Sequence, residues 1–359
     1  MSRNKVRTSE DWDDDEYASG ETYIPAPRRQ HRRQRSVWPW LLLGCAGGII
    51  ILVLTAVIIV LLAVRSATNG GSVPILPGIP SNQSTYSKQS QQTLPISSLT
   101  QVQVHNQIGN VTITADPSAT NATITTVKNA KAASSDDANK EFNAISVQVQ
   151  APVAPNYILS IDAKVPDTGS LFGSHTDSVD LNIILPTTAL APQSSITTTT
   201  TPATPTNAPL PSFTLNADNS IGNINVSGFK GILLLKDDIG DITVDHITLF
   251  DTSRLLTGTG KVSFNGELNT IPLINGSTPR YKLQSETGTV DATLSGDSNV
   301  ILDAYTNTGT ITSDFPIKVT TSDQSASFFG PLNTSTPSGS AVPVLTLHVG
   351  TGNVLIHRA

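Results

Sequence analysis

The sequence predicts an all-β protein, in which a single-stranded β-helix (a β-solenoid) follows one N-terminal transmembrane helix. Three observations predict this fold class. An uncharged apolar stretch stands near the N-terminus, short segments of alternating apolar and polar residues fill the chain beyond it, and a glycine-centred pattern recurs within those segments. Together they divide the 359-residue chain into four regions.

Residues 1–35 are predicted to form a disordered cytoplasmic tail. The acidic run DWDDDEY (Asp11–Tyr17) is followed by five arginines within PRRQHRRQR, and apolar residues are few. A basic cluster beside a membrane is attracted to anionic lipids. It also fixes topology, because basic residues near a span stay on the cytoplasmic side.

Residues 36–65 are predicted to form a transmembrane helix. The stretch from Ser36 to Val64 carries no charge and is bounded by Arg35 and Arg65. A helix needs about 20 mostly apolar residues to cross the hydrocarbon core, so one span fits. The run is too long, and starts too late, for a cleaved signal peptide. The arginines before it place the N-terminus inside the plasma membrane and the rest of the chain outside.

The exported part begins with a predicted flexible linker, residues 66–95, which is rich in Ser, Gln, Gly and Pro without an apolar period. From residue 66 onward the chain holds 13 basic and 21 acidic residues. This balance argues against nucleic acid as a partner, because phosphate backbones require a basic face. The single cysteine, Cys45, lies in the predicted span, so the exported domain has no disulfide and depends on its own core.

Residues 96–359 are predicted to form the β domain. Segments such as QVQVHN, VTITAD, ATITTV and SVDLNIILP alternate apolar and polar residues, which is typical of half-buried strands. Residues 196–212 are a Thr/Pro-rich insert that indicates a protruding loop. The one candidate helix, residues 135–145, is short enough to be a single turn or a loop.

The repeat consists of a glycine with apolar residues two and four positions later, as in IGNVTI, IGNINV, IGDITV and TGNVLI. The seven repeat-turn glycines are Gly109, Gly222, Gly240, Gly260, Gly288, Gly309 and Gly352. From Gly222 to Gly309 they stand 18, 20, 28 and 21 residues apart, and the longer gap before Gly352 indicates a degenerate unit.

Glycine allows a turn with positive φ at little steric cost. The following apolar residues then point to one face of a strand, because side chains alternate. A unit of about 20 residues cannot bury that face alone, whereas stacked units bury a continuous column. An antiparallel sandwich with glycine-rich hairpins is the alternative that the pattern leaves open.

The pattern resembles a bacterial family of exported domains called putative adhesins, in which a strand ending in proline leads into repeats of the form T-x-x-G-x-I-x-V. Here the strand is LNIILP (Leu181–Pro186), and the resemblance covers about residues 96–359. It implies a β-helix on the cell surface. The insert at 196–212 and the loop near Pro331 depart from the family pattern.

Little in the sequence indicates chemistry. Asp237, Asp238 and Asp241 form a weak candidate calcium site, because carboxylates in turns suit that ion. Their spacing does not select the pair of carboxylates that glycoside hydrolysis needs, and the exported histidines lack zinc-site spacing. Asp237 and Asp238 are expected in a solvated turn. We therefore predict no enzyme activity and no cofactor.

The predicted function is that of a membrane-anchored, surface-exposed adhesin-like protein that binds or supports without catalysis. Its expected partners are the plasma membrane and a polymer or protein of the cell envelope or the extracellular space. Two alternatives remain open at this stage. One is an envelope sensor of stress or ligand that signals through its cytoplasmic tail, and the other is a polysaccharide-active β-helix enzyme.

Overall fold

The computed structural model describes residues 84–166, 177–190, 213–270, 277–333 and 342–359. The chain divides into two compact units, Met1–Ile79 and Pro80–Ala359, and all described residues belong to the second. The predicted tail, the predicted transmembrane helix and the Thr/Pro-rich insert lie outside the described residues. In the part that the structure describes, no helix is long and apolar enough to span a bilayer.

The described unit is all-β, as the sequence predicts, apart from one α-helix and one short 3₁₀-helix. The strands of its first half are β1 (Ser84–Leu94), β2 (Gln101–Ile108), β3 (Val111–Asp116), β4 (Ala122–Ala132), β5 (Ser146–Gln150), β6 (Ile158–Lys164), β7 (Ser178–Pro186), β8 (Thr214–Ile221) and β9 (Ile224–Ser227). Those of its second half are β10 (Lys230–Ile239), β11 (Ile242–Leu249), β12 (Arg254–Leu268), β13 (Arg280–Leu294), β14 (Ile301–Thr308), β15 (Ile311–Ser313), β16 (Thr320–Ser322), β17 (Ser325–Pro331) and β18 (Val344–Arg358). The helices are α2 (Ser135–Ala144) and η1 (Thr187–Ala189).

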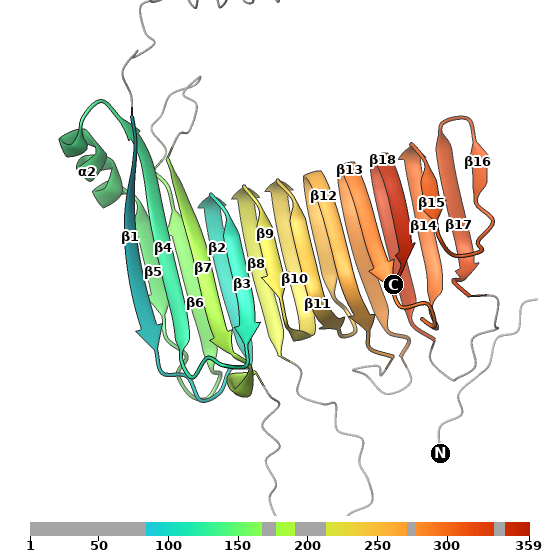
Figure 1. Ribbon diagram of the computed structural model, residues 1–359, viewed down its shortest axis with the longest axis horizontal. Helices are drawn as coiled ribbons and strands as arrows, with labels where there is room; N and C mark the ends of the chain where they lie inside the picture. The colour runs from blue at the N-terminus through green and yellow to red at the C-terminus, as the bar shows by residue number, and fades with distance from the viewer. Residues whose placement is uncertain (1–83, 167–176, 191–212, 271–276, 334–341) are drawn as a thin grey trace, which may run out of the picture. The chain divides into compact units, whose positions relative to one another are not determined.

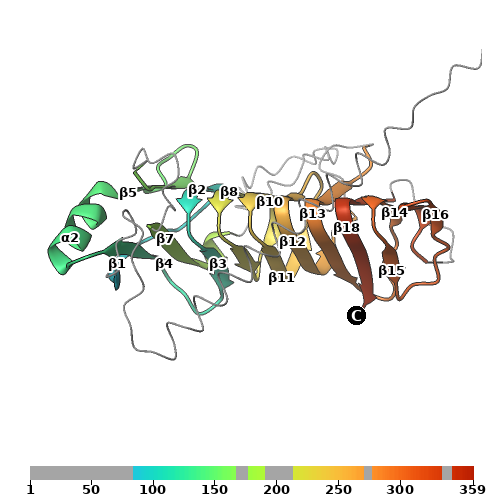
Figure 2. The ribbon, with the colours of Figure 1, turned by 90° about the horizontal axis from the view of Figure 1, so that it is seen from above.

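The strands form one hydrogen-bonded sheet that folds back on itself into two layers with the core between them (Figures 1 and 2). Three long strands, β12, β13 and β18, pass from the first layer into the second, and each has a repeat glycine near its middle. The first layer contains β5, β6, β2, β8, β10, β14, β17 and β16. The second contains β1, β4, β7, β3, β9, β11 and β15.

The middle of both layers is parallel and in register. Gly260 pairs with Gly288, and Gly288 pairs with Gly352. The apolar residues after the glycines are buried as the alternation predicts, for example Val262 and Val290, both 0% exposed. Antiparallel pairs occur only toward the two ends of the described sheet, between β1 and β4, β4 and β7, β5 and β6, β14 and β17, and β16 and β17. The antiparallel alternative therefore applies to the ends alone.

The order of strands in space differs from their order in the sequence. β18 lies between β13 and β14, where its red ribbon separates the two orange strands in Figure 1. β2 likewise lies between β6 and β8. The expectation of a degenerate unit in the gap before Gly352 is wrong. The chain between Gly309 and β18 instead forms β16 and β17, which extend the sheet beyond β14, and the Gly352 unit occupies an internal position.

The predicted linker over 66–95 is wrong for its last residues, because 84–94 form β1. This strand pairs with β4 along its whole length, from Ser84 with Ala132 to Leu94 with Ala122. Its side chains are polar and mostly exposed, so no apolar alternation marks it in the sequence. Tyr86 packs on a small second core cluster, Ala130, Ala132, Ala138 and Phe142, which α2 covers.

The seven repeat glycines stack into a single column, which we call the glycine column. In space its order is Gly109, Gly222, Gly240, Gly260, Gly288, Gly352 and Gly309. All seven have positive φ, between 126° and 155°. From Gly222 onward, a Cβ on any member would overlap the carbonyl oxygen of the glycine before it in this order. Each layer-to-layer corner therefore requires glycine for its conformation and also for its close approach to the next corner.

We predict that Gly288→Ala lowers the free energy of unfolding of the unit 80–359 by roughly 2–4 kcal/mol, since a side chain there is both strained and in collision with backbone. Urea unfolding followed by circular dichroism measures the change. Gly296→Ala is the matched control, because its Cβ would meet only the end of the Arg358 side chain, which can move. Equal stability of the two variants would contradict the stacking constraint.

We also predict that a fragment beginning at residue 96 is less stable than one beginning at residue 80, by about 2 kcal/mol or more. Removing β1 leaves the backbone groups on one edge of β4 without partners and uncovers the apolar cluster under Tyr86. The melting temperatures of the two fragments provide the measurement. A fragment beginning at residue 84 is the control and should match the longer one.

Candidate functional site

A row of six buried polar residues lines the inside of the glycine column. Each stands three positions before a repeat glycine, and each is at most 3% exposed. This inner polar row consists of Asn106, Asn219, Asp237, Thr257, Ser285 and Thr306. Four members donate to glycine carbonyl oxygens: Asn106 to Gly109 at 3.1 Å, Thr257 to Gly240 at 2.8 Å, Ser285 to Gly260 at 2.8 Å and Thr306 to Gly352 at 3.0 Å.

Asp237 is the one ionisable member of the inner polar row. Its Oδ2 accepts a hydrogen bond from Asn219 Nδ2 at 3.3 Å, whereas its Oδ1 is buried and has no partner among the described residues. Burial raises the pKa of this carboxyl to about 6, because desolvation disfavours the charged form. The expectation that Asp237 lies in a solvated turn is wrong. It belongs to β10 and points inward, as the other residues three before a glycine do.

The other two carboxylates of the calcium candidate engage separate partners. Asp238 is exposed and forms an ion pair with Lys236 at 2.8 Å. Asp241 follows its glycine directly, and its Oδ1 accepts the backbone N–H of Lys261 at 2.7 Å. In the described ranges no group of three His, Cys, Asp or Glu side chains is placed to hold a metal ion. The structure therefore does not bring Asp237, Asp238 and Asp241 together.

The Asp241 contact belongs to a second, outer series at the same corners. The side-chain oxygen of the residue after one glycine accepts the backbone N–H of the corresponding residue in the next unit. Asn110 Oδ1 accepts the backbone N–H of Asn223 at 3.1 Å, and Asn223 Oδ1 accepts the backbone N–H of Asp241 at 2.9 Å. The recurring Gly-Asn and Gly-Asp pairs of the sequence therefore have a structural role.

The first layer carries a polar hollow of about 530 Å³ on its outward side. We call it the amide groove. One of its rows crosses four strands and consists of Gln150, Ser160, Gln103 and Asn216. The neighbouring row consists of Gln148, Asp162, His105 and Asp218. Neighbouring strands stand about 4.8 Å apart, so each row repeats its hydrogen-bonding groups at that interval.

The charged groups of the amide groove are balanced by close partners. Asp162 forms an ion pair with Lys164 at 2.8 Å, and Asp218 lies 3.8 Å from Lys236. A ligand in the amide groove would therefore meet mainly the hydrogen-bond donors and acceptors of the Gln and Asn side-chain amides. No direct signal in the sequence marks this site, although the outward positions of QVQVHN are its polar residues.

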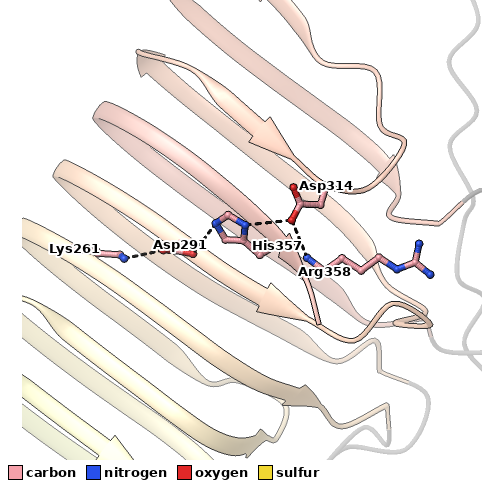
Figure 3. A network of polar contacts seen from close by, with 5 residues as sticks. All are labelled: Lys261, Asp291, Asp314, His357 and Arg358. Atoms are coloured by element: carbon pink, nitrogen blue, oxygen red, sulfur yellow. Dashed lines mark hydrogen bonds and ion pairs between the residues drawn. The ribbon is translucent and has the colours of Figure 1, made fainter.

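A polar network joins three strands on the outward side of the second layer (Figure 3). Asp291 Oδ2 pairs with Lys261 Nζ at 2.7 Å, and Asp291 Oδ1 lies 3.5 Å from His357 Nε2. The other ring nitrogen of His357, Nδ1, lies 3.2 Å from Asp314. No described hydroxyl or thiol joins His357 in this network, so the arrangement has no nucleophile. It connects β18 to β13 and to the residue after β15, which supports a structural role.

No protein-family model and no curated protein matches the chain. A putative cell adhesion protein from Clostridium sporogenes is similar at 10% identity with a TM-score of 0.37, over 76% of this chain and 100% of that one. A putative adhesin from Bacteroides fragilis is similar at 10% identity with a TM-score of 0.29, over 75% of this chain and 97% of that one. Similarities at this level say nothing about a ligand.

We predict that Asp237→Asn removes a pH dependence of stability between pH 4 and pH 7. Because the folded pKa is raised, the wild-type chain is most stable where the carboxyl is protonated in both states, and it loses about 3 kcal/mol as the pH rises through 6. Asparagine supplies a permanent donor, as Asn106 and Asn219 do. Urea unfolding of both chains at pH 4, 5, 6 and 7 tests this.

The matched control for this prediction is Asp238→Asn, which changes the exposed neighbour. It should keep the pH dependence with only a small shift to lower pH, because desolvation, the largest cause of the raised Asp237 pKa, remains. Parallel profiles for wild type and Asp237→Asn would show that Asp237 is already ionised at pH 4 and would refute the prediction.

Proposed function

We propose that the chain is a membrane-anchored, exported binding protein without catalytic activity, whose repeats form a β-solenoid. In this proposal the amide groove binds an uncharged, hydroxyl-rich polymer such as a glycan of the cell envelope. The N-terminal tail would be cytoplasmic and residues 36–65 would span the plasma membrane. The apolar stretch and its flanking arginines support this placement.

The observation that carries the proposal is the register of the amide groove. Gln150, Gln103 and Asn216 project from strands at known register positions, with Ser160 between the first two. Amide side chains both donate and accept hydrogen bonds, as sugar hydroxyls do. A row of such groups at strand spacing suits a ligand with repeating polar groups better than a single small molecule, because the hollow is open along the sheet.

A binding role fits the groove better than hydrolysis does. Glycoside hydrolysis needs one protonated and one ionised carboxyl on opposite sides of the scissile bond. Both carboxylates of the amide groove, Asp162 and Asp218, instead have a lysine beside them. Each carboxylate of the groove is thus engaged in an ion pair on its own strand or the neighbouring strand, and the two are not arranged as a free pair facing one ligand.

We predict that the double variant Gln103→Ala/Asn216→Ala binds isolated cell-wall glycan about tenfold more weakly than the wild-type chain, since two neutral hydrogen bonds contribute roughly 1.4 kcal/mol together. Co-sedimentation of the detergent-solubilised full chain with the glycan gives the affinity. Asn225→Ala is the control, because Asn225 lies on β9 in the other layer. Unchanged binding by the double variant would exclude the amide groove as the site.

A chain lacking residues 1–35 separates this proposal from the sensor alternative. The truncated chain should bind glycan as the full chain does. A cellular function that is lost on truncation while glycan binding persists would favour the sensor.

A further inference from the structure

Five of the cations in the described ranges have close partners in the fold, whereas three others gather in one place. Lys140, Lys164, Lys236 and Lys261 form ion pairs. Lys128 donates to two backbone carbonyls at the C-terminal end of α2, those of Phe142 and Ile145. In contrast, Arg254, Arg280 and Lys282 line one hollow of about 640 Å³, and no described carboxylate forms an ion pair with any of the three side chains. We call this hollow the basic groove.

The three cations lie at neighbouring positions on the outward side of the first layer. Arg254 on β12 pairs in register with Lys282 on β13, so their Cα atoms are about 4.8 Å apart. Arg280 stands two residues before Lys282 on the same strand, about 6.7 Å away. Tyr281 between them is buried, which fixes both neighbours on the outward side. The long side chains of all three can therefore reach one common point.

The remaining lining of the basic groove is mixed, because Val344 and Tyr281 stand beside polar residues. Thr278 and Thr346 contribute hydroxyl groups. Asp251 is the one carboxylate in the lining. It is 5% exposed, and its Oδ1 accepts the backbone N–H of Arg280 at 2.8 Å. With three cations against this one buried carboxylate, the groove keeps a net positive charge on a chain whose formal net charge is −6.

We propose that the basic groove binds a phosphodiester group of an anionic polymer. Two guanidinium groups and one ammonium offer many N–H donors around a single point, and a phosphate has enough acceptor oxygens to use donors from several directions. The groove is open and lies in the same row of the sheet as the amide groove, with Asn216 beside Leu234 and Leu234 beside Arg254. A chain molecule running across the strands can reach it.

A phospholipid headgroup offers the same phosphodiester chemistry, so the test must distinguish the two sources. The full chain, solubilised in a nonionic detergent, is titrated with soluble polyphosphate and, separately, with a short-chain phosphatidylglycerol below its critical micelle concentration. The proposal expects saturable binding of polyphosphate that weakens as salt is added. Binding of the lipid with no binding of polyphosphate would overturn the assignment to a polymer.

The variants assign the binding to these residues. Arg280→Gln/Lys282→Gln should weaken polyphosphate binding at least tenfold and make its salt dependence shallower. Lys230→Gln/Lys318→Gln, which removes two cations outside the groove, should stay within twofold of wild type. Equal loss in both variants would show general charge attraction and would overturn the site. An unchanged circular dichroism spectrum excludes misfolding as the cause of a loss.

This site stands independently of the amide groove. Gln103→Ala/Asn216→Ala should retain wild-type affinity for polyphosphate, and Arg280→Gln/Lys282→Gln should retain wild-type affinity for uncharged glycan. A loss of polyphosphate binding in the amide variant would overturn the separate phosphate site while leaving the glycan proposal in place.

Discussion

The close stacking of backbone at the layer-to-layer corners is the constraint on which the rest of the structure depends. Each corner of the glycine column lies so near the next that a Cβ would overlap a carbonyl oxygen. This contact sets the register of both layers at once, because the strands before and after each glycine are locked to their neighbours at the same point. The apolar residues that follow, such as Val262 and Phe264, are thereby aligned into one core.

The glycine column brings many backbone carbonyl groups together inside the fold. These carbonyls need hydrogen-bond donors, since buried polar groups are costly without partners. The inner polar row supplies some of these donors from within. On the outer side, the Asn or Asp that follows four of the seven glycines accepts backbone N–H groups. Because the corners and the core carry the stability, the outward residues of the first layer are free to vary. Both the amide groove and the basic groove are built from such outward residues.

Local features of this fold could be predicted from the sequence, and relations between distant segments could not. The positions of Gly240 and Ile242 follow from local sterics and side-chain alternation, which any one unit displays. The internal position of β18 does not follow from such local features, because all units carry the same pattern and any unit could stack on any other. β1 could not be predicted from alternation, because its side chains are polar and mostly exposed on both faces. Asp237 was expected in a turn, although it stands three positions before Gly240 as Asn219 stands before Gly222. The two grooves could not be predicted, because each is formed by several strands whose register the sequence does not show.

The internal position of β18 has a consequence for how the chain reaches its fold. The ribosome makes β14 through β17 before β18, yet β18 separates β14 from β13. The two flanking strands must either remain apart until β18 arrives or part again to admit it. Such non-local closure slows folding and leaves strand edges unpaired for longer. A newly made chain is therefore exposed to strand exchange with a second copy, which makes it a natural client for a folding factor.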